Sequence, residues 1–180
     1  IRHTHDLVKE SVKSRTVSDV PLASFLSGGV DSSIVSWCLS ELQDTPIDTF
    51  SIGFDNPLFD ESKNAKTVAK TIGSKHHSFV CTDKDIHSIS EEILLNFDEP
   101  YADSSALASY WVAHHTSKQF KVALTGDGGD EVFGGYNKYL IGQLSHRYQQ
   151  WVPKPLHWFN RFFFNRFLPS KSDRRGFQYR

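Results

Sequence analysis

The sequence predicts an α/β protein built on a parallel sheet with helices on both faces. Short apolar runs alternate along the chain with longer segments whose apolar residues recur at helical spacing. The runs are nearly continuous in apolar residues, which is typical of strands that helices cover on both sides. Two of the runs lead directly into glycine-rich segments that also carry serine or aspartate, at the edge where such a sheet binds its ligand.

The predicted elements follow a regular order from the N-terminus. Apolar residues at helical spacing predict a helix over residues 6–16, and Pro21 prevents its continuation because the residue before a proline avoids the helical conformation. An apolar run predicts a buried strand over 22–26. A second helical period predicts a helix over 31–42, and the next apolar run predicts a strand over 47–54.

The same alternation continues along the chain. Helical spacing predicts a helix over 60–72, and the glycine that follows it is a typical stop signal. A third strand is predicted over 76–81. Two further helical periods cover 85–97 and 104–117, and a short apolar run predicts the last strand over 122–124.

The segment Ser27–Ser33, SGGVDSS, joins the first predicted strand to the second predicted helix. Its two glycines allow a tight turn in which several backbone N–H groups face one anion. The helix adds the positive end of its dipole and the serines add hydroxyl donors, so the segment suits a phosphate or pyrophosphate. Asp31 would repel a phosphate unless Mg²⁺ lay between them. The alternative is an ordinary capped turn, and the missing lysine excludes the Walker pattern.

The segment Thr125–Tyr136, TGDGGDEVFGGY, carries three acidic residues and five glycines directly after the last predicted strand. Clustered carboxylates repel one another, so a divalent cation or a cationic partner is expected beside them. Asp31 and Asp130 would then share Mg²⁺, which leaves Asp127 for proton transfer or for steering an ammonium group. The alternative is a turn followed by the acidic first turn of a helix.

These two segments, with Ser18-Asp19-Val20-Pro21 ahead of them, resemble the synthetase domain of glutamine-dependent asparagine synthetases. The likeness covers roughly residues 5–140. SGGVDS alone is shared with other ATP pyrophosphatases, among them GMP and NAD synthetases and tRNA thiolation enzymes, whereas its pairing with GDGGDEVFGGY is much more specific. The resemblance implies an adenine nucleotide alpha-hydrolase-like fold and a cytoplasmic ligase of amino-acid biosynthesis.

The resemblance also implies a reaction and its participants. MgATP would adenylate the side-chain carboxylate of aspartate with release of pyrophosphate, and ammonia derived from glutamine would displace AMP to give asparagine. Residues 27–33 would hold the β- and γ-phosphates, Asp31 and Asp130 would bind Mg²⁺, and Asp127 would handle a proton. The implied ATP-binding residues are Leu26, Ser27, Gly28, Gly29, Asp31, Ser32, Ser33, Ile52, Thr125 and Gly126.

The sequence departs from the family pattern in several places. Asp127 stands where studied members carry a glutamate, so its side chain is one methylene shorter. The family's glutaminase domain begins with a nucleophilic cysteine, whereas this chain begins with Ile1, lacks methionine, and has only Cys38 and Cys81, which are expected to be small buried residues. No counterpart of the family's later lysine segment is recognisable. We therefore expect a partial synthetase domain over residues 1–150, which binds ATP weakly or not at all and is poorly active alone. The expected partner is the glutaminase domain of a longer parent.

Two weaker features have ordinary structural interpretations. Asp103 and Ser104 precede the fifth predicted helix and suit its N-terminal cap, although the resemblance places this loop near the acceptor. The nine histidines lack the spacing of a metal site. The adjacent pairs, His76-His77 and His114-His115, are expected to point in different directions on a strand or helix. A homodimer is left open.

Residues 151–180 form a basic, aromatic tail with a predicted helix that continues into sequence absent from this chain. The tail carries seven basic residues and a single acidic one, Asp173. Packing against the absent sequence is favoured over nucleic-acid binding. No apolar run approaches the length of a membrane span, no signal peptide is recognisable, and two cysteines without a CxxC pair suit a reducing cytosol.

Two alternatives to the asparagine reaction remain. The acceptor could be a sugar acid of surface-polysaccharide synthesis, or the chain could be a non-catalytic nucleotide-binding module. The three carboxylates Asp31, Asp127 and Asp130 argue against the module, because binding alone would not need three acids beside a phosphate.

Overall fold

The computed structural model describes residues 2–57, 60–99, 103, 105–153 and 155–159. The chain divides into two compact units, one ending at Gly129 and one beginning at Asp130, and each is described by itself. The first unit holds the sheet and most of the predicted elements.

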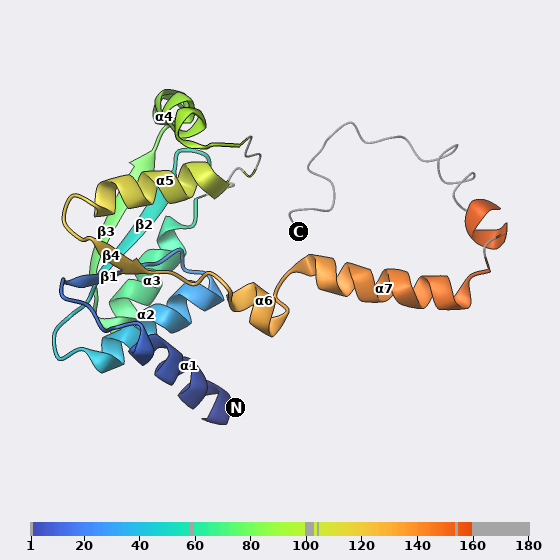
Figure 1. The fold of residues 1–180 in the computed structure, drawn as a ribbon, viewed down its shortest axis with the longest axis horizontal. Helices are drawn as coiled ribbons and strands as arrows, with labels where there is room; N and C mark the ends of the chain where they lie inside the picture. The colour runs from blue at the N-terminus through green and yellow to red at the C-terminus, as the bar shows by residue number, and fades with distance from the viewer. Residues whose placement is uncertain (1, 58–59, 100–102, 104, 154, 160–180) are drawn as a thin grey trace. The chain divides into compact units, whose positions relative to one another are not determined.

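A four-stranded parallel sheet forms the centre of the first unit, which confirms the predicted fold class. The strand order is β3-β2-β1-β4 (Figure 1). β1 (Leu22–Phe25) and β2 (Asp48–Phe54) are central, and β3 (Lys75–Cys81) and β4 (Val122–Leu124) are the edges. Since β1 pairs with β2 on one side and β4 on the other, the segments that follow β1 and β4 leave neighbouring strands.

Helices cover both faces of this sheet, as predicted (Figure 1). Right-handed crossovers explain the division, because the chain moves from β1 to β3 in one direction and returns to β4 on the other side of β1. One face carries α2 and α3, with α1 packed on α2, and the other carries α5, with α4 packed on α5. Their bounds are α1 Arg2–Ser14, α2 Val30–Leu42, α3 Ser62–Ile72, α4 Asp83–Asn96 and α5 Ser105–Thr116.

Alternation along β1 divides the core into two layers. Ala23 and Phe25 pack with Phe50 of β2 on the face that α5 covers. Ser24 points to the opposite face, where its hydroxyl lies 2.9 Å from the Ser36 hydroxyl of α2 with both residues fully buried. This hydrogen bond satisfies two polar groups that would otherwise be costly to bury, and it joins α2 to the central strand.

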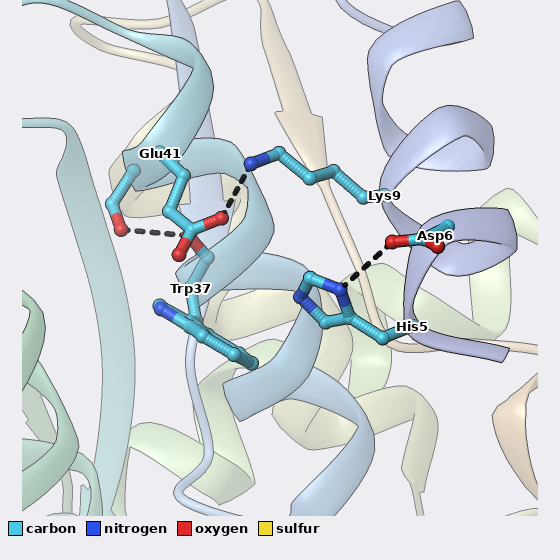
Figure 2. A network of polar contacts seen from close by, with 6 residues as sticks. His5, Asp6, Lys9, Trp37 and Glu41 are labelled. Carbon is cyan, nitrogen blue, oxygen red and sulfur yellow. Dashed lines mark hydrogen bonds and ion pairs between the residues drawn. The ribbon is translucent and has the colours of Figure 1, made fainter. Parts of the chain in front are cut away.

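α1 is fixed to α2 by one buried anchor and several surface contacts. Val12 is 6% exposed and packs in the cluster that contains Cys38 and Leu39 of α2. Figure 2 shows the surface contacts, in which Lys9 Nζ lies 2.6 Å from Glu41 Oε2. Exposed ion pairs contribute little to stability, so the apolar anchor is the main source of this packing.

The second unit contains α6 (Gly129–Phe133, which begins on the last residue of the first unit) and α7 (Asn137–Trp151). α7 was not predicted from the sequence. It contains Gly142, a weak helix former, and none of its residues is buried. In the tail, residues 155–159 are helical, whereas the remainder of the predicted tail helix lies outside the described residues. Within the described part of the chain, no helix is long and apolar enough to cross a membrane.

His76 of β3 makes the stability of this fold depend on pH. Its Nδ1 lies 3.0 Å from the Thr49 hydroxyl and its Nε2 lies 3.1 Å from the Ser51 hydroxyl. Burial lowers the pKa of His76, with smaller contributions from the charges of His77 and Lys66. The native ring therefore binds a proton less readily than the unfolded ring, whose pKa is about 6.5.

We predict that acid weakens the fold through His76. Because the unfolded chain binds more protons, the free energy of unfolding is highest above about pH 6.5 and falls as the pH drops below that value. Urea unfolding at pH 7.5 and 5.5 measures this slope. His76→Gln, which retains hydrogen-bonding groups without titrating, should flatten the slope. Burial also lowers the pKa of His115, so part of the slope should remain in this variant. An unchanged slope in His76→Gln would contradict the prediction.

Candidate active site

The two glycine-rich segments leave the sheet at the point where its strand order reverses. The chain builds β2 and β3 on one side of β1 and β4 on the other, so β1 and β4 flank the switch point. Ligands of parallel α/β proteins bind beyond the strand ends at this position. Residues 27–33 follow β1 and residues 125–129 follow β4, which places both predicted segments of the first unit there.

Residues 27–29 form a tight turn into α2. Gly28 has a φ of +85°, a conformation that favours glycine. Gly29 is the N-cap of α2 in an extended conformation, and no side chain caps this helix end. The first intrahelical bond runs from Ser33 N–H to the Gly29 carbonyl at 3.1 Å. The N–H groups of the first turn lie before that bond and have no acceptor within the helix, which suits them to an anion.

Serine hydroxyls hold this turn together. The hydroxyls of Ser27 and Ser32 lie 2.9 Å apart, and the Gly29 N–H donates to Ser27 Oγ at 3.2 Å. The Ser33 hydroxyl donates to the Gly29 carbonyl at 2.6 Å. The three predicted phosphate donors therefore share one small network, and a phosphate that bound there would compete for these hydroxyls.

Glycine packing joins the turn to its neighbours in the first unit. A methyl group on Gly28 would lie 2.6 Å from the Ala65 nitrogen in α3. A methyl group on Gly126 would lie 2.6 Å from the Ser32 nitrogen in α2, and one on Gly129 would lie 2.5 Å from Cγ of Asp31. Such distances leave no room for a side chain, so the segment after β4 rests directly on the first turn of α2.

The predicted acids have different surroundings. The half-buried carboxylate of Asp31 lies against Gly129, inside the first unit. Asp127 is exposed and accepts a hydrogen bond from the Thr125 hydroxyl at 2.9 Å. Asp130 is the first residue of the second unit, so the two predicted Mg²⁺ ligands belong to different units.

Glu131 is engaged by a tyrosine within the second unit. The Tyr136 hydroxyl donates to Glu131 Oε1 at 2.6 Å. This bond raises the pKa of Tyr136 to about 12 and lowers the pKa of Glu131. The third acid of the cluster thus has a neutral donor of its own.

The remaining predicted residues line the strand ends or cap a helix. The side chain of Leu26 is fully buried in a cluster with Ala65 and Ala69, whereas Ile52 near the end of β2 is half-buried. Asp103 accepts from the Ser105 N–H at 2.9 Å, which is the predicted capping role and lowers the pKa of Asp103. Ser104 lies outside the described residues.

No group of three or more His, Cys, Asp or Glu side chains in the described part of the chain is arranged to hold a metal. His76 and His77 have partners of other kinds, and His77 Nε2 lies 2.7 Å from Asp48 Oδ1. The two cysteines are buried, as predicted, and they do not form a disulfide with each other.

The sequence profile of the asparagine synthase family matches residues 3–179. The chain belongs to the asparagine synthase family. It is 39% identical over 139 residues to asparagine synthetase [glutamine-hydrolyzing] 1 of Bacillus subtilis, which covers 77% of the chain and 22% of that protein. It is 40% identical over 137 residues to a Methanocaldococcus jannaschii protein provisionally named asparagine synthetase 2, which covers 76% of the chain and 26% of that protein.

This family member therefore spans about a quarter of the length of the curated relatives that it matches. Among solved structures, the NH3-dependent NAD synthetase of Campylobacter jejuni in complex with nitrate has a TM-score of 0.46 and 14% identity. The match covers 76% of this chain and 58% of that chain.

The close contacts of Gly28, Gly126 and Gly129 were not predicted from the sequence. The motifs indicate that glycine is needed, but not which residue each glycine meets, because the partners lie on other elements. The position of Gly126 two residues after the short run that becomes β4 was the available signal for a close approach.

We predict that Gly28→Ala destabilises the chain more than Gly73→Ala does. Both glycines have positive φ, so both substitutions incur the left-handed penalty of about 1–2 kcal/mol. A methyl group at Gly73 meets nothing within 4 Å, whereas one at Gly28 overlaps α3 and adds about 1–3 kcal/mol. Urea unfolding of both variants measures the difference. Equal losses of unfolding free energy in the two variants would contradict the prediction and would show that the turn can move away from α3.

Proposed function

We propose that the parent of this chain is an ATP-dependent, glutamine-hydrolysing asparagine synthetase and that the chain supplies its carboxylate-activating site. The observation that carries the proposal is the packing of Gly126 and Gly129 against the first turn of α2. This packing sets a carboxylate-bearing turn and an anion-binding turn side by side at the switch point. The family and the names of the relatives support the same activity.

In the proposed first step, an oxygen of the aspartate side-chain carboxylate attacks the α-phosphorus of ATP. The bond from that phosphorus to the bridging oxygen breaks, and pyrophosphate leaves with the electron pair. The N–H groups of the first turn of α2 and the hydroxyls of Ser27, Ser32 and Ser33 would stabilise the charge on this leaving group. Ile52, Thr125 and Gly126 would line the adenosine site at the ends of the strands, and the buried side chain of Leu26 would support it from below.

In the proposed second step, ammonia attacks the acyl carbon of the aspartyl adenylate. The bond between this carbon and the AMP oxygen breaks, giving asparagine and AMP. The attacking nitrogen must lose a proton, and Asp127 would accept it because its carboxylate is exposed and held by Thr125.

Asp31 and Asp130 would hold Mg²⁺. Carboxylates are ligands that Mg²⁺ prefers, and the family resemblance implies this pair of aspartates. When bound, the ion would neutralise charge on the phosphate oxygens and remove the repulsion between Asp31 and pyrophosphate.

The wider assignments belong to the same proposal. Residues 1–150 would be part of the synthetase domain, and 151–180 would pack on sequence of the longer parent. A glutaminase domain of that parent would supply ammonia in the cytoplasm, where the two buried thiols are stable. The loop at Asp103 and Ser104 would face the acceptor. A homodimer is compatible with the proposal but is not needed by it.

Carboxylate-dependent ATP–pyrophosphate exchange by the full-length parent tests the first step. We expect exchange with aspartate and none with uronic acids. Asp31→Asn should lower the exchange by about 100-fold because charge stabilisation at the leaving group is lost, while Asp44→Asn, an exposed change between α2 and β2, should leave it unchanged. Exchange with a uronic acid alone would favour the sugar-acid alternative, and exchange with no carboxylate would leave only a nucleotide-binding module.

Asp127 is predicted to separate the two steps. Asp127→Asn removes the proton acceptor but keeps the size of the side chain, so ATP–pyrophosphate exchange should persist. Asparagine formation from ammonia should fall by about 100-fold, within the range for loss of a general base. Equal loss of exchange and asparagine formation would contradict this assignment and would place Asp127 in the first step.

A further inference from the structure

We propose that Asp60 is a positioning residue for the pyrophosphate turn, a role that rests on the proposed function. Asp60 lies in the connection between β2 and α3, away from both glycine-rich motifs. The sequence predicts a helix that begins at Asp60, whereas in the structure Asp60 lies just ahead of α3. Its contacts link the end of β2 to the part of α3 on which Gly28 packs.

The side chain of Asp60 joins two elements. Its carboxylate accepts hydrogen bonds from the Ser62 N–H at 3.1 Å and the Ser62 hydroxyl at 3.0 Å, at the start of α3. The Ser62 bonds, together with a backbone bond from Phe54 at the end of β2, lower the pKa of Asp60. One side chain therefore holds the last residue of β2 and the first residue of α3.

Gly53 of β2 leaves space for the Asp60 carboxylate. A methyl group on Gly53 would lie 3.0 Å from Asp60 Oδ1 and 3.4 Å from Cβ of Ser62. The strand can approach this closely only because Gly53 has no side chain. The start of α3 is thus fixed both by hydrogen bonds and by direct packing on the strand.

Gly28 connects α3 to the pyrophosphate turn. A methyl group on Gly28 would lie 2.6 Å from Cβ of Asn64 and 2.6 Å from the Ala65 nitrogen, both in the first turn of α3. A shift of this turn would therefore change the space that holds Gly28 in its left-handed conformation. Ala69, one turn further along α3, is buried in the cluster that contains Leu26, so the rest of α3 stays anchored and the shift is local.

These contacts predict which kinetic constant responds to Asp60. The turn that moves with α3 is the one assigned to the β- and γ-phosphates, whereas nothing in this argument involves the carboxylate substrate. Loss of the Asp60 bonds should raise the KM for ATP in the exchange assay by about 10- to 100-fold, the effect of a displacement near 1 Å. The KM for aspartate should change by less than twofold.

The experiment uses the full-length parent with three changes at this connection. Asp60→Ala removes the hydrogen bonds, Asp60→Asn keeps an acceptor for the Ser62 N–H and should restore most of the ATP affinity, and Asp55→Ala is the exposed control. Ser62→Ala, which removes only the hydroxyl donor, provides a milder change if Asp60→Ala does not fold. We expect Ser62→Ala to raise the KM for ATP in the same direction.

Amide hydrogen exchange of the ligand-free parent distinguishes failure of this inference from failure of the proposed function. Asp60→Ala should speed exchange in residues 26–33 and at the start of α3, with the rest of the sheet unchanged. If the wild type catalyses no ATP–pyrophosphate exchange, the proposed function fails and this local measurement still tests the positioning role. The role of Asp60 would be overturned if Asp60→Ala left amide hydrogen exchange over residues 26–33 unchanged, or if it accelerated hydrogen exchange equally throughout the first unit.

Discussion

The close approach of Gly126 to the backbone of Ser32 is the constraint on which the candidate site depends. Only a residue without a side chain permits the segment after β4 to rest on the first turn of α2. Because the two segments leave neighbouring strands, this contact decides how near their polar groups come. A bulkier residue at this position would have to push the segments apart, even if every acid and serine were present.

Buried interactions below the site keep the two strands and α2 in the arrangement that this contact needs. Ser24 of β1 is bonded to Ser36 of α2, and its hydroxyl also lies 3.5 Å from the Leu124 carbonyl of β4. Ser24 and Leu124 are paired in the sheet, so this serine connects β1, β4 and the helix that packs on them. The rigid part of the fold therefore lies directly under the turns, and the turns carry the exposed polar groups, as is usual for functional loops on a scaffold.

The sequence was sufficient for features that depend on neighbours along the chain. The order of elements in the first unit follows from apolar spacing, and the end of α3 at Gly73 follows from a local stop signal whose left-handed conformation the structure confirms. The contacts of Gly28 with α3 and of Asp60 with Ser62 and Phe54 were not predicted, because they depend on how β2 and α3 pack. α7 was missed although Ile141, Leu144, Tyr148 and Trp151 recur at helical spacing, and none of its residues is buried.

The central claim is that the turns after β1 and β4 form one nucleotide site. Amide hydrogen exchange of the full-length parent, with and without MgATP, tests this claim most directly. The account predicts that MgATP slows exchange in residues 27–33 and in residues 125–129 over the same range of concentrations, because one ligand contacts both turns. Protection of only one segment, or of neither at concentrations that saturate binding, would contradict the account.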